Sequence, residues 1–147
     1  MPNHYHLLVR QNIDNGISKF ISRLQNSHAK YLNIKLNRNG ALYQSPFKNT
    51  IIETDEQLLH VARYIHLNPL TSYIVKGPNE LKSYPWCSFS DYSGRSPRRL
   101  IKRNLVLSHY GNQQELIAFT LDRVDYQRKL NRINHLILDD KVGIPRV

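Results

Sequence analysis

The part of the sequence that most restricts the fold is residues 4–9, where His4 and His6 lead directly into the apolar run Leu7-Leu8-Val9. A short apolar run of this kind predicts a β-strand, in which alternate side chains point to the same face. The two imidazoles would then share one face and could bind one divalent metal ion, while Tyr5 would point to the opposite face. A His-x-His pair on its own is more often two hydrogen-bonded surface side chains.

A second polar group lies on a predicted helix. Thr54 and Gln57 have the spacing of a capping box, which indicates that the helix begins there. Residues four apart are neighbours on a helix surface, so one polar stripe is predicted to contain His60, Tyr64 and Asn68. A different side of the helix is predicted to face the core through Leu58, Ala62 and Ile65. Pro69 is predicted to end the helix, because proline lacks an N–H and clashes with the preceding turn.

The rest of the chain predicts three further helices and one more strand. A helix is expected from about Asn15 to Tyr31, capped by Asp14 or Asn15. Its apolar side, expected in the core, comprises Ile17, Phe20, Ile21, Leu24, His28, Tyr31 and Leu32. A turn at residues 37–40 precedes a strand over residues 48–53. The other two helices are expected near residues 98–109 and 112–131.

A loop-rich link over residues 77–97 precedes these last helices, and it contains four aromatic side chains. They are Tyr84, Trp86, Phe89 and Tyr92. Aromatic rings in a loop can stack on the bases of a single strand. The more frequent role of such a set is to anchor the loop to the core, and both roles stay open at this point.

The charge of the chain indicates a nucleic-acid partner. Lys and Arg number 21 against 11 Asp and Glu, a formal net charge of +10 in 147 residues. Such a surplus attracts phosphate backbones, although it would suit an RNA-binding protein equally well. Cations are densest after Gly94, where phosphate contacts are expected from Arg98, Arg99, Lys102 and Arg103. The alternative for this run is a solvated helix face.

Other classes are excluded by what the sequence lacks. Cys87 is the only cysteine, so no internal disulfide can form. No apolar run has the length of a membrane span or of a signal peptide, so a cytoplasmic protein without membrane contact is expected. The predicted organisation is one main domain over residues 1–95, which the resemblance described next implies is a catalytic domain, a basic helical extension over 96–138 and a flexible tail over 139–147.

Four blocks of sequence carry a resemblance to a known family. They are Met1-Pro2-Asn3-His4-Tyr5-His6-Leu7-Leu8, Gly40-Ala41-Leu42-Tyr43-Gln44-Ser45-Pro46-Phe47, Ala62-Arg63-Tyr64-Ile65-His66-Leu67-Asn68-Pro69 and Tyr84-Pro85-Trp86-Cys87-Ser88-Phe89. In this order and spacing they resemble the REP-associated tyrosine transposases, which are IS200-like members of the single-tyrosine HUH transposases. The resemblance covers residues 1 to about 95.

This resemblance implies an α+β fold, namely a partial ferredoxin-like HUH transposase domain with a C-terminal helical extension. In the family the His-x-His strand is the third of the sheet and follows a strand, a helix and another strand. Here it begins at residue 1, so the domain is expected to be incomplete at its N-terminus. The exposed sheet edge would favour a homodimer or aggregation.

The resemblance also implies roles for individual residues. His4, His6 and Asn68 would bind Mg²⁺ or Mn²⁺, and Tyr64 would attack a phosphodiester of single-stranded or hairpin DNA. A 5′-phosphotyrosine and a free 3′-hydroxyl would result, which preserves a bond for rejoining without ATP. Gln44 and Lys48 would line the DNA path. The roles of His60 and His66 stay open, with packing or hydrogen bonding favoured for His66.

Three functions are therefore weighed. The leading one is a transposase that cleaves and rejoins hairpin, REP-like DNA. The second is a catalytically inactive remnant that still binds DNA hairpins through its basic surface. The third, an RNA-binding protein with an accidental His-x-His, explains the charge but not the four ordered blocks.

Overall fold

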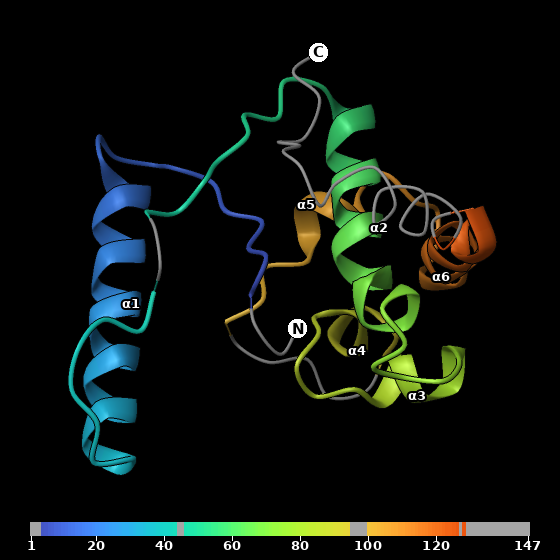
Figure 1. The fold of residues 1–147 in the computed structure, drawn as a ribbon. Coiled ribbons are helices and arrows are strands. Elements are labelled where there is room, and N and C mark those ends of the chain that lie inside the picture. The colour runs from blue at the N-terminus through green and yellow to red at the C-terminus, as the bar shows by residue number, and fades with distance from the viewer. Residues whose placement is uncertain (1–3, 44–45, 95–99, 127, 129–147) are drawn as a thin grey trace. The chain divides into compact units, whose positions relative to one another are not determined.

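The computed structural model describes residues 4–43, 46–94, 100–126 and 128, and these form two compact units (Figure 1). The helical unit comprises the described residues up to His6 together with those from Glu53 onward. The α1 unit comprises Leu7–Ile52. The expected DNA contacts Gln44, Arg98 and Arg99 and the predicted tail over 139–147 lie outside the described residues.

Helix α2, Asp55–Thr71, is the centre of the helical unit, and its predicted start is confirmed. The Thr54 hydroxyl oxygen accepts a hydrogen bond from the Gln57 N–H at 3.2 Å. In return, the Gln57 side-chain oxygen accepts one from the Glu53 N–H at 2.9 Å. Two N–H groups that a helix start leaves without intrahelical acceptors are thereby satisfied, and this fixes where α2 begins.

The predicted end of this helix is wrong, because α2 continues through Pro69 to Thr71. Proline removes only its own N–H, so a single carbonyl, that of Ile65, loses its usual donor. The Cys87 thiol lies 3.9 Å from that carbonyl oxygen and compensates for part of the loss. The helix instead ends at Thr71, and Tyr73, two residues further on, has a positive φ of 56°. The Ile74 N–H then bonds back to the Pro69 carbonyl at 2.9 Å, as in a Schellman motif.

Four shorter helices complete the helical unit. They are α3, Pro78–Ser83; α4, Phe89–Tyr92; α5, Asn104–Leu107; and α6, Gln113–Leu121. Helices α5 and α6 lie within the predicted ranges 98–109 and 112–131, but neither covers its described range. Residues 101–103 and 108–109 are not helical, and residues 122–123 separate α6 from residues 124–126, which are helical again. Helix α6 is capped by Asn112, whose side-chain oxygen accepts a hydrogen bond from the Glu115 N–H at 3.0 Å.

The hydrophobic core lies entirely within the helical unit. Helices α2 to α6 surround one cluster of buried side chains, which comprises Ala62, Leu67, Leu70, Val75, Leu81, Cys87, Phe89, Tyr92, Val106 and Leu116. Phe89 and Tyr92 are thus core residues, which settles the alternative left open for these two aromatic side chains. Because packing surrounds α2 over its C-terminal half, that half is held rigidly.

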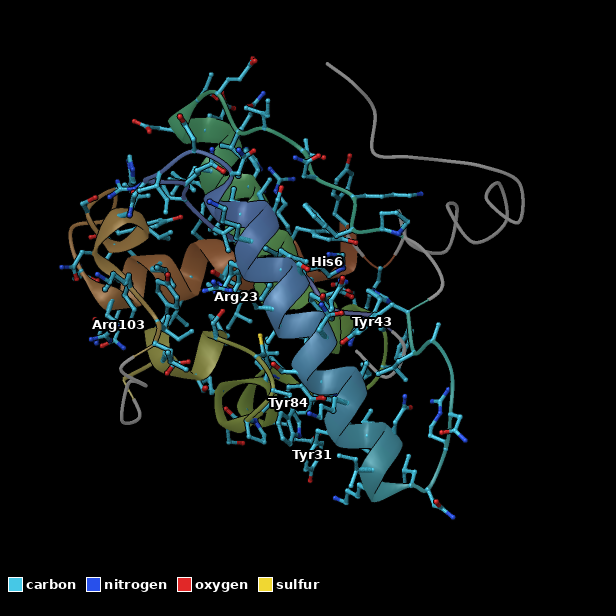
Figure 2. The ribbon with its side chains drawn as sticks, turned by 90° about the vertical axis from the view of Figure 1, so that its left-hand side faces the viewer. His6, Arg23, Tyr31, Tyr43, Tyr84 and Arg103 are labelled. Atoms are coloured by element: carbon cyan, nitrogen blue, oxygen red, sulfur yellow. The ribbon has the colours of Figure 1, made fainter. Side chains whose placement is uncertain are left out.

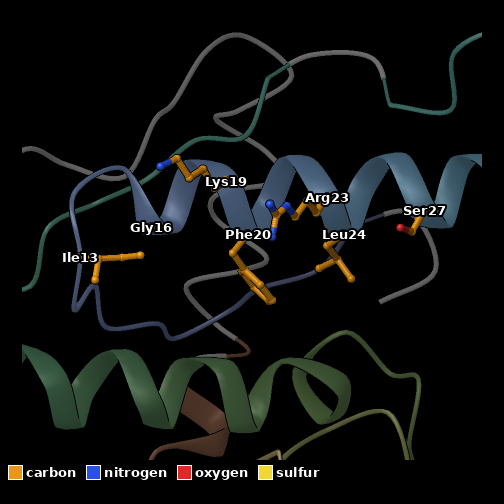
Figure 3. A pocket seen from close by; sticks show the side chains of 7 residues that line it. All are labelled: Ile13, Gly16, Lys19, Phe20, Arg23, Leu24 and Ser27. Carbon is orange, nitrogen blue, oxygen red and sulfur yellow. The ribbon is translucent and has the colours of Figure 1, made fainter.

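The α1 unit has no comparable core. Helix α1, Gly16–Lys35, begins one residue after the predicted start and ends four residues later than predicted. Of its expected apolar side, only Ile21 is buried, whereas Phe20, Leu24 and Tyr31 are exposed, so the expectation of a core face is wrong. Figure 3 shows Phe20 and Leu24 projecting from the same side of α1, near Ile13.

The predicted fold class is contradicted, because no β-strand is present among the described residues. Residues 4–12 and 46–53 have no regular secondary structure, although strands were expected at 4–9 and 48–53. An apolar or β-branched run favours an extended backbone, but a strand forms only where a neighbouring strand supplies ladder hydrogen bonds. The described structure is helical, and neither a ferredoxin-like sheet nor the sheet edge from which a homodimer was inferred is found in it.

Candidate active site

Although they are not on a strand, His4 and His6 lie side by side. Their ring centroids are 5.0 Å apart, with an edge-to-face angle of 83°. Partial burial lowers the pKa of both imidazoles, and the neighbouring His4 lowers the pKa of His6 further. A lowered pKa keeps both rings neutral at neutral pH, which is the form of imidazole that binds a metal ion.

Tyr64 joins this pair from the middle of α2. The ring centroids of His6 and Tyr64 are 5.5 Å apart at an angle of 78°. The two residues are distant in the sequence but belong to the same unit, so the contact is part of the helical unit itself. Tyr64 is 42% exposed, so part of this residue faces solvent.

Asn68, the expected third metal ligand, lies one helical turn beyond Tyr64 and is buried. Its side-chain oxygen accepts a hydrogen bond from the Ser72 hydroxyl at 3.1 Å. A carbonyl oxygen has two lone pairs, so this bond leaves one lone pair for a second interaction.

The three residues of the stripe predicted for α2, namely His60, Tyr64 and Asn68, face different neighbours. His60 is directed toward α6, where its ring centroid lies 6.1 Å from that of Phe119. Residues four apart are offset by about 40° around a helix, so the offset from His60 to Asn68 is about 80°. Tyr64 consequently meets His6, while His60 and Asn68 have other neighbours.

His66 packs in the core, in agreement with the packing role favoured for it. Its ring lies 5.5 Å from that of Phe89 and 4.8 Å from that of Tyr92, between centroids. Burial lowers the pKa of His66 to about 4, although the nearby Asp91 carboxylate opposes this shift. His66 is therefore neutral at neutral pH and is part of the support for the helix that carries Tyr64.

Arg63 was missed by the sequence analysis and fixes α2 against α6. Its guanidinium lies 4.3 Å from the Phe119 ring centroid and donates a hydrogen bond to His60 Nδ1 at 2.7 Å. It also donates to the Phe119 carbonyl at 3.5 Å. No sequence signal could reveal this role, because it depends on a residue more than fifty positions away.

The expected DNA-contacting residues differ in their surroundings. Lys48, in the α1 unit, and Lys102, in the helical unit, are exposed to solvent. Arg103 is half-buried and donates a hydrogen bond to the Asp91 carbonyl at 2.8 Å (Figure 2). Arg103 therefore connects the segment before α5 to α4, which leaves its guanidinium less available to a phosphate than that of an exposed residue.

The two histidines fit one metal ion. Metal–nitrogen bonds of about 2.1 Å bring two rings on one ion to within roughly 6 Å of each other, between centroids. The observed separation of 5.0 Å satisfies this limit, and both rings are neutral. In the described part of the chain, no group of three or more His, Cys, Asp or Glu side chains is placed to hold an ion.

Comparison with known proteins gives one match. Residues 1–68 match the family model described as transposase, IS200 like. No curated protein sequence and no solved structure matches the chain. The matched segment includes the two histidines, Tyr64 and Asn68. As to membranes, the helices in the described ranges are all too short or too polar to cross one.

Proposed function

Since residues 1–68 place this chain in the IS200-like transposase family, we propose that it cleaves and rejoins single-stranded, hairpin-forming DNA with Tyr64 as the nucleophile. Membership of this family indicates DNA binding and DNA transposition. The proposal adds the chemistry, the single-stranded REP-like hairpin as the substrate and the residues that act on it.

The proposed reaction exchanges one phosphodiester for another. The Tyr64 hydroxyl gives up its proton and its oxygen attacks the scissile phosphorus. The bond from phosphorus to the 3′-oxygen breaks, and that oxygen takes up one proton and leaves as a free 3′-hydroxyl. The 5′-phosphate remains bonded to Tyr64. Attack by a 3′-hydroxyl reverses these steps and rejoins the strand, so no external energy source is required.

A tyrosine hydroxyl with its ordinary pKa of about 10 is a weak nucleophile at neutral pH, so the site has to supply help. His4 and His6 would hold Mg²⁺ or Mn²⁺, with Asn68 as a third ligand. The bound ion would polarise the scissile phosphate and offset the charge that builds on its oxygens. The neutral imidazoles and the rigid α2 are what this chain contributes to that arrangement.

The contact between His6 and Tyr64 is the observation that carries the proposal. This chemistry requires a metal-binding pair and a nucleophile from distant parts of the sequence to lie close together, and the short distance between the rings of His6 and Tyr64 supports the proposal. Packing of α2 through His66, Leu67 and Leu70 fixes the helix that carries Tyr64.

The proposal is tested by a covalent adduct on denaturing gels. The full chain is incubated with a fluorescent hairpin oligonucleotide that has single-stranded flanks, with Mn²⁺ or Mg²⁺ present. We expect a band of slower mobility for the wild type and for Tyr73→Phe, and none for Tyr64→Phe. Tyr73 is the matched control because it is an exposed tyrosine just beyond the same helix. An adduct that persists in Tyr64→Phe would refute the assignment.

The alternative is a DNA-binding protein that no longer cleaves. One observation favours it, namely that Asn68 is buried and its side-chain oxygen is bonded to Ser72. If the third ligand cannot turn toward the histidines, the ion is held weakly. Tight binding of the same oligonucleotide without any adduct, at all metal concentrations, would establish this alternative.

A further inference from the structure

Trp86 is the largest apolar side chain of the helical unit and lies outside its core. It is 80% exposed, whereas Phe89 and Tyr92, which follow it, are fully buried or nearly so. Exposure of a tryptophan forgoes a large hydrophobic gain, since a buried tryptophan removes about 150–250 Å² from water. Such an exposed ring in an otherwise packed region indicates contact with a ligand.

The backbone around Trp86 is fixed rather than loose. Tyr84, Pro85, Trp86 and Cys87 form a turn that is closed by a hydrogen bond from the Cys87 N–H to the Tyr84 carbonyl at 3.4 Å. Pro85 restricts φ inside the turn. At its ends, Tyr84 packs against the core and Cys87 is part of it. The ring is therefore presented from a supported position.

This turn lies against the helix that carries the nucleophile. The Cys87 thiol is 3.9 Å from the Ile65 carbonyl oxygen and 3.6 Å from that of His66. These two residues directly follow Tyr64 in α2. The residue that follows Trp86 thus packs against the helical turn after the proposed nucleophile, and both belong to the helical unit.

The surroundings of Trp86 favour a nucleotide base over a protein as its ligand. A protein interface needs a cluster of exposed apolar side chains around its central residue. From Ile74 to Gly94, Trp86 is the only large hydrophobic side chain that is exposed. Over the same residues 74–94 there are two lysines and two acidic residues, of which Asp91 is buried, and the chain as a whole carries a net charge of +10. A lone π-face on a chain with a large positive net charge suits a base of a single strand.

Resting on the proposed function, we propose that Trp86 is a base-stacking residue, which holds one unpaired base of the DNA strand that Tyr64 attacks. The stacked base would lie in the single-stranded flank, because a paired base has no free face for the indole. Stacking tolerates any base, so Trp86 would position the strand without reading its sequence.

The test uses the only tryptophan of the chain as its own probe. An oligothymidine of twenty residues is titrated into the full-length protein, and Trp emission and the anisotropy of a labelled copy are measured. We expect strong quenching of Trp86 at the same DNA concentration that raises the anisotropy. Replacement Trp86→Ala should weaken binding by about 5- to 100-fold, and Trp86→Phe by less. Tyr126→Ala, which removes another exposed ring, should bind as the wild type does.

The outcomes separate the two proposals. A rise in anisotropy without quenching, or an unchanged dissociation constant for Trp86→Ala, would refute stacking and leave the proposed function intact. An equal loss of affinity for single-stranded and double-stranded DNA would also refute it. No binding of DNA by the wild type at low salt would overturn both the stacking role and the proposed function.

Discussion

The two units of this molecule differ in what their apolar and charged residues do. In the helical unit, apolar side chains from five helices meet in one core, and α2 is held on several sides. In the α1 unit, one residue of the helix is buried, while Phe20, Leu24 and Tyr31 are exposed. Residues 7–52 also carry seven Lys or Arg against a single Asp. The same amphipathic pattern therefore supports a packed fold in one unit and leaves a basic helix with an uncovered apolar side in the other.

The largest expected effect compares one substitution in both units. Leu67→Ala removes a fully buried side chain from the core and should lower the free energy of unfolding by about 2–5 kcal/mol. Leu24→Ala, at a position that is 40% exposed on α1, should change it by less than about 1 kcal/mol. Urea unfolding followed by far-UV circular dichroism measures both. Equal losses would mean that α1 is covered as fully as α2.

The second prediction concerns acid. The pKa of His66 is about 4 in the folded state and about 6.5 when unfolded, so below pH 6.5 the unfolded chain binds the proton more readily. The stabilisation is complete above pH 6.5 and is lost as the pH falls toward 4, by on the order of 3 kcal/mol. Urea midpoints at pH 7, 5.5 and 4 measure it. In His66→Leu, the part of the pH dependence of stability that is due to His66 should vanish. If the urea midpoint of this variant fell with pH as steeply as that of the wild type, His66 would not be the residue responsible.

Helix starts give the third comparison. Thr54→Ala removes the side-chain cap of α2 and should cost about 1 kcal/mol. Asn15, at the start of α1, makes no such bond and has a positive φ of 58°. Asn15→Gly should therefore be neutral or slightly stabilising, because glycine adopts this conformation at no steric cost. Thermal melts measure the stability of the two variants. A loss of stability in Asn15→Gly as large as that in Thr54→Ala would mean that the Asn15 side chain caps α1, which the structure does not show.

The smallest expected effect concerns charge and leaves stability unchanged. Replacement of Lys19, Arg23 and Lys30 by alanine in α1 should lower the salt dependence of single-stranded DNA binding by up to about 0.7 log units per lost phosphate contact. The matched triple variant of the helical unit replaces Arg98, Arg99 and Lys102. Filter binding from 50 to 300 mM salt gives both slopes. An unchanged slope in one variant would assign the phosphate contacts to the other unit.

Arg103 is kept in that variant for a physical reason. Its bond to the Asp91 carbonyl means that Arg103→Ala should destabilise the helical unit in addition to any effect on DNA. A variant that keeps its full stability while its salt slope falls would show that Arg103 acts on phosphate alone.

The parts of this structure that follow from local chemistry could be predicted from the sequence. The start of α2 was found because Thr54 and Gln57 make their hydrogen bonds within one turn. The pairing of His6 with Tyr64 was reached only through the family blocks, since no spacing rule connects residues so far apart. Strands were predicted at 4–9 and 48–53 because their residues suit a strand, but a strand also requires a partner, which a local pattern cannot reveal.

The continuation of α2 through Pro69 gives a similar lesson. The loss of one N–H was correctly anticipated, but its cost depended on whether another donor lay near the Ile65 carbonyl. The Cys87 thiol, which comes from a distant turn, supplies part of what was lost. The prediction that the apolar side of α1 is buried was wrong for the opposite reason. A helical repeat of apolar residues shows which side chains could be buried, but it does not show what would cover them.

The placement of Cys87 also makes it possible to measure how often the turn that contains it separates from α2. Its thiol is buried against the helical turn that follows Tyr64, and it is the only thiol in the chain. An alkylating reagent can reach the sulfur only when the turn that contains Cys87 separates from α2. The alkylation rate of Cys87 in the native protein is divided by the rate in an unfolded peptide. This ratio gives how often the helix that carries Tyr64 becomes uncovered, and no label has to be introduced.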